Sequence, residues 1–331
     1  MKSFRELMTL LLILSLFILL LRQINRKEYL QNVKTYNTEI HFITFWNNDV
    51  NAKNRVINKI NEYKQSFVRI IKKINIKKHD INRLFKKIQS GGKKYNKSDV
   101  TVFIIEVPSV YKIHRTFSNK SGENVNDYMY ELKTAARGGY KNYKIAHGSF
   151  DVKEANDFFT EYFKYLGNFN NYKEILNELN SFNIFWIYDR VTVKEYGVEA
   201  GDTDLVVDSI PSACFILRTT KTSNKIYKKM YGKSKLFDLQ DFDSNYYPKL
   251  WLLDIKKNNK IISAHNIKIP TLLDHFMLGL YHMYMHKNGK QNNNRINILK
   301  DMSNKLGYNN VDIDILLNFL KTKSINISIP N

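Results

Sequence analysis

Two aspartates separated by one residue form the pattern in this chain that is most able to do chemistry. Asp202 and Asp204 stand in Asp202-Thr203-Asp204, directly before the apolar run Leu205-Val206-Val207. Side chains alternate along a strand, so both carboxylates would share one face, about 7 Å apart. Carboxylates this close repel each other unless a cation lies between them. The sequence therefore predicts a divalent metal ion, Mg²⁺ or Mn²⁺, at Asp202 and Asp204, where it could also hold phosphate oxygens.

The elements that would position this pair can be read from the neighbouring sequence. Residues 172–179 have the spacing of apolar residues typical of a helix, and 183–188 read as a strand. A polar stretch then leads to the strand that carries the two aspartates. The run Leu250-Trp251-Leu252-Leu253-Asp254-Ile255 reads as a later strand. A helix is expected over 270–286, beginning near a proline.

This order of elements resembles the nucleotidyltransferase superfamily, whose fold is that of the DNA polymerase β palm. The family pattern is a helix, a strand ending in Gly-Ser, an Asp-x-Asp on the next strand and a third carboxylate on a later strand. The resemblance covers residues 170 to 331. It implies that Asp202 and Asp204 hold the metal ion. It also implies that Asp254 completes the catalytic site or activates the acceptor hydroxyl.

The chain departs from the family pattern at one point. Asp189-Arg190 stand where the family has Gly-Ser, and the glycine there lets the backbone come close to a triphosphate. The sequence therefore leaves open whether the site is active, inactive, or used for a different phosphate-containing group. Membrane-anchored relatives of this broad fold include the fukutin and LicD-type phosphotransferases, which act on glycans. Their longer spacing and glycine-rich approach to the aspartates are not matched here.

Basic residues near the aspartates could bind the phosphates of a donor. Arg190, Arg218 and Lys221 are the predicted contacts with a nucleotide or nucleotide-sugar donor. The alternative is that the Lys-rich segment from 218 to 235 is the exposed side of a helix. Both interpretations remain open at this stage.

Three further groups favour structural roles over chemistry. His282 and His286 have the i, i+4 spacing that zinc uses, but no Glu follows the first His, so core or interface histidines are expected. His147-Gly148-Ser149 lacks the pattern of a nucleophilic serine and reads as a strand-to-helix turn. Cys214, in an apolar stretch, is expected to be a small buried hydrophobe.

The N-terminus predicts a membrane anchor. Leu7 to Leu21 is apolar except for Thr9 and Ser15, and residues 1–28 are assigned to the anchor and its basic flank. No small-x-small cleavage site follows, so an uncleaved single-pass anchor is favoured over a cleaved signal peptide or a buried helix. The side of the membrane on which the body lies stays open.

A basic neck follows the anchor. Residues 53–94 contain 14 Lys and Arg but only two acids, Glu62 and Asp80. Apolar residues at helical spacing predict two amphipathic helices, joined by a turn at 77–80 and ended by Gly91-Gly92. Such a surface could contact anionic lipid or nucleic acid. The alternative is a solvated face in a lysine-rich chain.

Composition and periodicity give the overall class. The 331 residues carry a net charge of +21, 43% are hydrophobic and one is cysteine, which excludes a disordered chain, a disulfide framework and a cysteine-based zinc site. Strands are expected at 40–46, 100–107 and 143–150, and a helix at 152–165. The predicted fold is α/β of the mixed α+β kind. It comprises the anchor (1–28), a basic helical and mixed α/β region (29–170) and a nucleotidyltransferase-like domain with a helical end (171–331).

The functional hypothesis is a membrane-anchored protein that transfers a nucleotidyl or sugar-phosphate group with Mg²⁺ or Mn²⁺. The alternative is a non-catalytic membrane-anchored scaffold that uses a degenerate version of the same fold. A short N-terminal anchor followed by basic residues also resembles the envelope proteins of large nuclear insect viruses. The sequence does not decide whether the protein is an enzyme.

Overall fold

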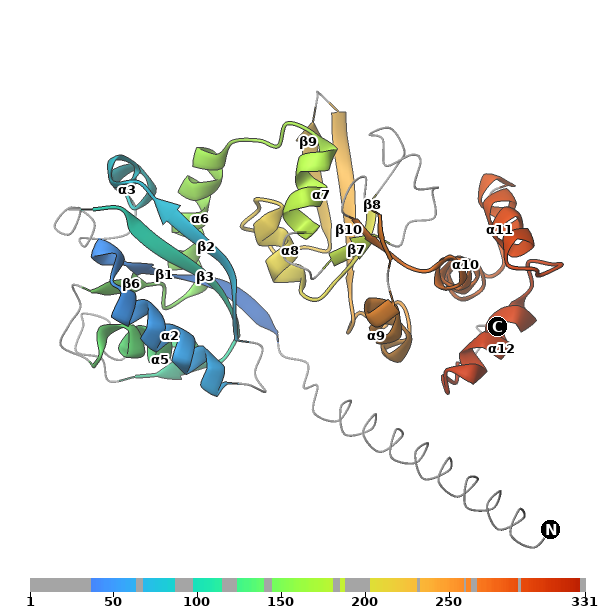
Figure 1. Ribbon diagram of the computed structural model, residues 1–331, viewed down its shortest axis with the longest axis horizontal. Coiled ribbons are helices and arrows are strands. Elements are labelled where there is room, and N and C mark those ends of the chain that lie inside the picture. The colour runs from blue at the N-terminus through green and yellow to red at the C-terminus, as the bar shows by residue number, and fades with distance from the viewer. Residues whose placement is uncertain are drawn as a thin grey trace, which may run out of the picture.

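The computed structural model confirms a mixed α/β fold built on two four-stranded sheets (Figure 1). The predicted anchor, residues 1–28, lies outside the part of the chain that the structure describes. Among the described residues, no helix is both long enough and apolar enough to cross a bilayer. The structure describes residues 37–63, 68–86, 98–114, 124–139, 145–180, 185–187, 203–230, 233–258, 260–262, 267–290 and 293–327.

The first sheet has the strand order β2-β3-β1-β6. Its central strands β1 (Thr38–Phe45) and β3 (Val100–Pro108) are antiparallel, and all nine residues of β3 are buried. β2 (Arg69–Ile76) and β6 (Ala146–Gly148) form the edges. The strands predicted at 40–46 and 100–107 are confirmed. The strand predicted within 143–150 is confirmed at 146–148.

Helices cover both faces of this sheet, which explains why most residues of its central strands are apolar and buried. α2 (Val50–Glu62) and α5 (Asp127–Arg137) pack on one face, against Phe45 and Phe103. α3 (Lys78–Leu84) and α6 (Val152–Leu166) pack on the other. A short hairpin, β4 (Tyr111–Ile113) with β5 (Asn124–Asn126), precedes α5. The helix predicted at 152–165 is confirmed.

The neck differs from the prediction of two helices. α2 is a helix, but β2 is a strand, and its Ile71, Ile74 and Ile76 are buried in the core. Isoleucine is β-branched and favours strands, and β3 supplies a long partner strand for β2. The second predicted helix is confirmed by α3, which buries Ile81 and Leu84, but it begins at Lys78, so the turn predicted at 77–80 is wrong. Gly91 and Gly92 lie outside the described residues.

The second sheet has the order β7-β8-β10-β9. β7 (Phe185–Ile187) is antiparallel to β8 (Thr203–Val207), and β8 is parallel to β10 (Lys233–Asp241). β9 (Lys225–Met230) pairs antiparallel with β10 at the edge. α7 (Tyr172–Asn180) precedes β7, and α8 (Ile210–Ile216) follows β8. The helix predicted at 172–179 and the strand predicted at 183–188 are confirmed.

One apolar core joins the two sheets. Leu205 and Phe237, from the second sheet, belong to the same buried cluster as Phe42 and Phe158. α8 lies between the sheets and packs on β1 and β10 (Figure 1). The predicted boundary at residue 171 is therefore crossed by continuous packing.

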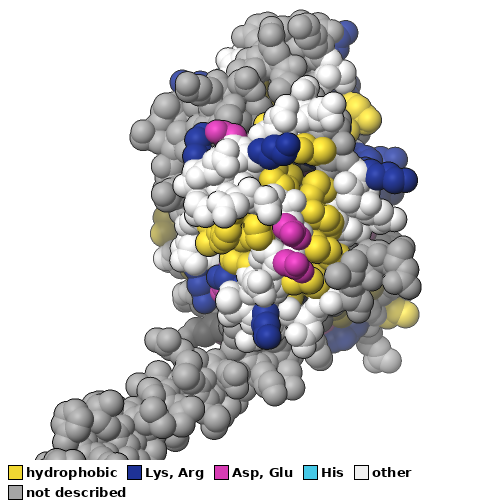
Figure 2. All heavy atoms as spheres, turned by 90° about the vertical axis from the view of Figure 1, so that its right-hand side faces the viewer, with side chains coloured by type: hydrophobic (Ala, Val, Ile, Leu, Met, Phe, Trp, Pro, Cys, Tyr) yellow, Lys and Arg dark blue, Asp and Glu magenta, His cyan; other side chains and the backbone are white. Residues whose placement is uncertain are grey.

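Helices form the C-terminal end. α10 (Leu272–Tyr281) continues into a π-helical turn, η3 (His282–His286), as expected for a helix over 270–286. α11 (Asn293–Lys305) and α12 (Ile313–Thr322) lie at the end opposite the first sheet (Figure 1). Seen from that end, hydrophobic side chains gather around acidic ones (Figure 2).

The strand predicted at 250–255 is wrong, because these residues lie in α9 (Lys249–Asn258). Trp251, Leu252 and Ile255 form one buried face at helical spacing, and they pack on α10 and α12. The apolar run was long enough for a strand but equally compatible with a buried helix. A small hairpin, β11 (Lys260–Ile262) with β12 (Ile267–Ile269), follows.

Candidate functional site

The candidate site lies on the face of the second sheet that points away from the shared core. Along β8, Leu205 and Val207 join the core between the sheets, so Asp204 and Val206 project from the opposite face. Asp238 of β10 is the register partner of Asp204. Partners in a parallel pair project from the same face of strands about 4.8 Å apart. The fold therefore sets two carboxylates side by side, and both residues are partly buried.

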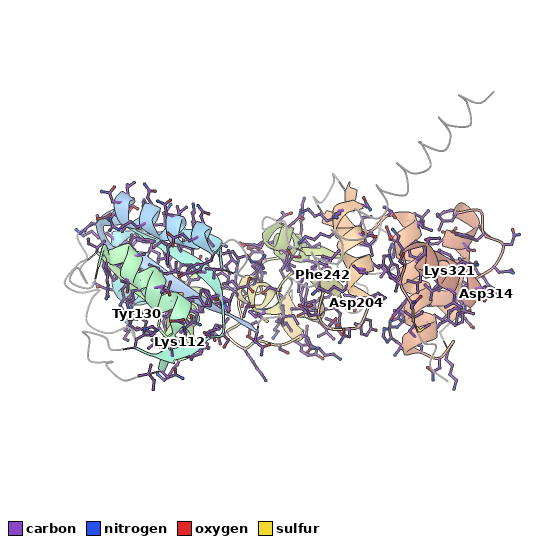
Figure 3. All side chains as sticks on the ribbon, turned by 90° about the horizontal axis from the view of Figure 1, so that it is seen from below. Lys112, Tyr130, Asp204, Phe242, Asp314 and Lys321 are labelled. Atoms are coloured by element: carbon purple, nitrogen blue, oxygen red, sulfur yellow. The ribbon has the colours of Figure 1, made fainter. Side chains whose placement is uncertain are left out.

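The surroundings of this pair are polar and include one lysine. The Gln240 side-chain amide donates a hydrogen bond of 3.3 Å to Asp238 Oδ1. Lys225 of β9, the register partner of Asp238, has its Nζ 4.0 Å from Asp238 Oδ2 and a side chain that is 60% exposed. Figure 3 labels Asp204 in the second sheet and Phe242, which directly follows β10. The arrangement combines two anionic ligand groups with a solvent-exposed cation.

The sequence-predicted metal and catalytic residues are only partly brought together. Asp204 lies where it was expected, whereas Asp202 is outside the described residues. Asp254 lies on α9, and its Oδ2 is 3.4 Å from Lys323 Nζ beyond the end of α12. Asp238 is the carboxylate next to Asp204. Its own sequence signal was an aspartate between apolar residues, Leu236-Phe237-Asp238-Leu239, which resembles the environment of Asp204.

The predicted donor-binding residues also separate. Arg218 is 9% exposed, and its guanidinium lies 3.7 Å from the centre of the Phe169 ring. It also donates to Gly167 O at 2.9 Å and pairs with Glu174 at 3.4 Å. These contacts attach the end of α8 to α6 and α7. Lys221 is exposed in the loop between α8 and β9, and Arg190 lies outside the described residues.

The histidines on the C-terminal helices pack against tyrosine. His282 Nδ1 and the Tyr246 hydroxyl are 2.8 Å apart, and His286 stacks on the Tyr246 ring with centroids 3.9 Å apart. His286 Nε2 also donates to the Tyr246 carbonyl at 2.8 Å. Within the described ranges, no three His, Cys, Asp or Glu residues are grouped to hold a metal ion. The contacts of His282 and His286 with Tyr246 are those expected of packing histidines.

A buried polar chain that the sequence did not reveal joins two residues of β1 to Ser149, which directly follows β6. His41 Nδ1 lies 2.9 Å from Ser149 Oγ, and His41 Nε2 lies 2.8 Å from Glu39 Oε1. The groups have the order of an acid–histidine–serine triad. However, Ser149 is fully buried and its Oγ accepts the Phe42 N–H, so no substrate can reach it. The chain connects strands instead of activating a nucleophile.

Two structural predictions in this region are confirmed. β6 ends at Gly148 and α6 begins at Val152, with Asp151 accepting the Glu154 N–H as its N-cap, so His147-Gly148-Ser149 leads from the strand into the turn before the helix. Cys214 is 2% exposed within the core, and burial raises the pKa of its thiol. Neither feature supplies a nucleophile.

Comparison with known proteins adds no family to this picture: the chain matches no protein-family model, no curated protein and no solved structure.

Proposed function

We propose that residues 171–331 form a metal-dependent transferase site centred on Asp204 and Asp238. The observation that carries this proposal is the parallel pairing of β8 with β10, which makes the two partly buried aspartates register partners on one face of the sheet. Asp202 is predicted from the sequence to share that face. The reaction is transfer of a nucleotidyl or sugar-phosphate group from a nucleotide or nucleotide-sugar donor.

The residues fit a hard divalent cation. Mg²⁺ is commonly held by one or two carboxylates and completes its six ligands with water and substrate phosphate oxygens. Asp204 and Asp238 supply two such carboxylates from rigid, adjacent strands, and their mutual repulsion favours a cation between them. When bound, the ion would neutralise charge on the transferred phosphate. Lys225 would attract the same phosphate from the β9 side.

Asp238 replaces Asp254 as the third carboxylate of the proposed site. In the nucleotidyltransferase pattern, the third carboxylate lies on a later strand beside the Asp-x-Asp. β10 is such a strand, whereas Asp254 lies on a helix and faces Lys323. The proposed ligand set is therefore Asp202, Asp204 and Asp238.

The test is to measure the affinity of full-length protein in detergent for Mn²⁺ by calorimetry. Asp204→Asn and Asp238→Asn should each weaken binding by roughly tenfold or more, because each removes one anionic ligand. Asp254→Asn is the matched control and should bind as the unchanged protein does. Loss of binding in Asp254→Asn, with binding retained in Asp238→Asn, would contradict the proposal.

A nucleotide screen then separates enzyme from scaffold. A nucleotide or nucleotide sugar added with metal should raise the melting temperature, because a ligand that binds only the folded state stabilises it. If metal binds but no donor shifts the melting temperature, the non-catalytic scaffold is the better function. The Asp189-Arg190 replacement of Gly-Ser favours that second function.

We also propose that residues 1–28 anchor the protein in a membrane as a single-pass segment. The neck could add contacts with anionic lipid, but several of its cations are engaged within the protein. Arg69 pairs with Glu106, Lys72 with Glu178, and Arg55 donates to the Ala135 and Ala136 carbonyls. The remaining lysines of the neck would therefore make any contacts with anionic lipid.

A further inference from the structure

A cavity lies on the side of the second sheet opposite Asp204. It has a volume of about 710 Å³ and opens between the start of β1, α6, the N-terminus of α8 and the loop 219–224. The ends of the parallel strands β8 and β10 reach it through Asp208 and Asp241. Ligands of open α/β sheets characteristically bind at the carboxyl ends of parallel strands. The size is that of a small-molecule site.

The charged residues that line this cavity are acidic, whereas the chain as a whole is basic. The protein has 52 Lys and Arg and a net charge of +21. Among the described residues that line the cavity, none is Lys or Arg, and five are acidic. A phosphate or carboxylate ligand would meet no cation in the lining and would be repelled by its acids. The five acidic residues are Glu39, Glu106, Asp208, Asp241 and Asp243.

Partners within the fold neutralise or saturate four of these five. Asp208 accepts Lys256 Nζ on both oxygens at 2.8 Å, and Asp243 pairs with Lys249 at 2.6 Å. Glu106 is 1% exposed and bound by Arg69 and three hydroxyls. Glu39 accepts hydrogen bonds from His41 and from three other residues, Ser109, Tyr111 and Asn126.

Asp241 is the exception. Its carboxylate accepts the backbone N–H of Asp243 at 3.1 Å, and no basic side chain among the described residues lies within 4.0 Å of it. Burial and the neighbouring Asp243 charge raise its pKa. One uncompensated negative charge therefore faces the cavity.

The rest of the lining offers hydrogen bonds and an apolar wall. The side-chain amides of Asn156 and Asn224 make no hydrogen bond to another described residue. Phe215 and Pro211 supply apolar surface beside them. A ligand that fits must carry positive charge near Asp241, polar groups for the amides, and hydrocarbon for the wall.

We propose that this cavity binds a small organic cation, a primary amine or guanidinium compound with a short hydrocarbon chain. The positive group pairs with Asp241. The chain lies on the apolar wall, and the second polar end reaches Asn156 or Asn224. This site is separate from the proposed transferase site and does not depend on it.

The test measures binding of agmatine and spermidine to full-length protein in detergent by calorimetry. Asp241→Asn keeps the acceptor for the Asp243 N–H and should weaken both by roughly tenfold, since one charge-assisted contact is lost. Asp301→Asn removes an exposed carboxylate paired with Lys305 on α11 and should leave binding unchanged. Asn224→Trp, which fills the cavity from an exposed loop position, should also weaken binding.

Further outcomes decide against the proposal. Absence of binding by both amines at millimolar concentration would overturn it, as would equal binding by Asp241→Asn and the unchanged protein. Citrate should not bind, and binding of citrate in place of the amines would refute the charge argument. Asp238→Asn should bind agmatine normally, so failure of the transferase proposal and failure of this one give different results.

Discussion

The carboxylates of the two sheets are the same chemical groups in opposite situations. In the first sheet, Glu106 lies on the central strand β3, is 1% exposed, and is held by Arg69, Ser209 and Ser212. In the second sheet, Asp204 and Asp238 are adjacent like charges on a partly exposed face. The first arrangement satisfies a buried charge and stabilises the fold. The second brings two carboxylates together, which is the basis of the metal site proposed above.

This difference predicts which carboxylates can be replaced without loss of folding stability. Glu106 Oε2 lies 2.8 Å from Arg69 on β2 and 2.7 Å from Ser212 on α8, so it joins the first sheet to the helix that precedes β9. Removing it would leave a cation and hydroxyls without their partner. Asp204 and Asp238 are partly buried and lie next to each other, so replacing either by Asn removes a like-charge neighbour.

The largest expected effect is therefore at Glu106. Glu106→Ala should lower the free energy of unfolding by about 3–5 kcal/mol, because breaking a buried ion pair leaves the other charge uncompensated. Urea unfolding of full-length protein in detergent measures this. Asp301→Ala, at an exposed pair on α11, should change the value by less than about 0.5 kcal/mol. Equal effects from the two variants would show that Glu106 is not held as a buried, stabilising charge.

An acid-dependent effect of intermediate size is expected at Glu154. Burial alone would raise the pKa of Glu154, but the hydrogen bond to His147 and the charges of His147 and Lys133 lower it to about 2, from a usual 4.5. Its stabilisation is complete above pH 4.5 and is lost as the pH falls toward 2. The shift corresponds to about 3 kcal/mol.

Unfolding of the unchanged protein and of Glu154→Gln, measured from pH 6 down to about pH 2.5, tests this. The unchanged protein should lose more stability over the window below 4.5 than the variant does. Burial also lowers the pKa of His147, so protonation of that ring destabilises both proteins below its usual value of 6.5. Parallel curves below pH 4.5 would show that Glu154 is not held ionised by the fold.

The smallest effect on stability is expected at the candidate site. Asp238→Asn should leave the metal-free free energy of unfolding unchanged or raise it by up to about 0.5–1 kcal/mol, because it removes a like-charge neighbour. Thermal unfolding at low salt with a chelator measures this. A loss above about 2 kcal/mol would show that Asp238 holds the fold as Glu106 does, and the comparison between the sheets would fail.

Much of the fold could be predicted from local sequence. α6 has Asp151 at its cap and apolar residues at helical spacing, and β3 is a continuous apolar run ended by Pro108. These patterns act within a few residues, so they can be read without knowing what lies nearby. The mixed α/β class followed from them. The Asp204 strand was recognised in the same way.

Tertiary pairing decided what these patterns could not. The isoleucines of β2 fit a helix or a strand, and only β3 beside them selected the strand. The run containing Asp254 fitted a strand or a buried helix, and packing on α10 and α12 selected the helix. Local spacing is ambiguous for short apolar runs, because burial on all sides suits both structures.

Three features follow from the amino-acid sequence alone: the net charge, the predicted anchor and the aspartate pattern of the second sheet. Only the tertiary structure decided which other carboxylate stands beside Asp204. Asp238 is 34 residues further along the chain, and its position follows from hydrogen bonding between β8 and β10. Because side chains alternate along β10, Asp241 lies on the face opposite Asp238. Residues distant in sequence meet through strand register, which no local pattern encodes.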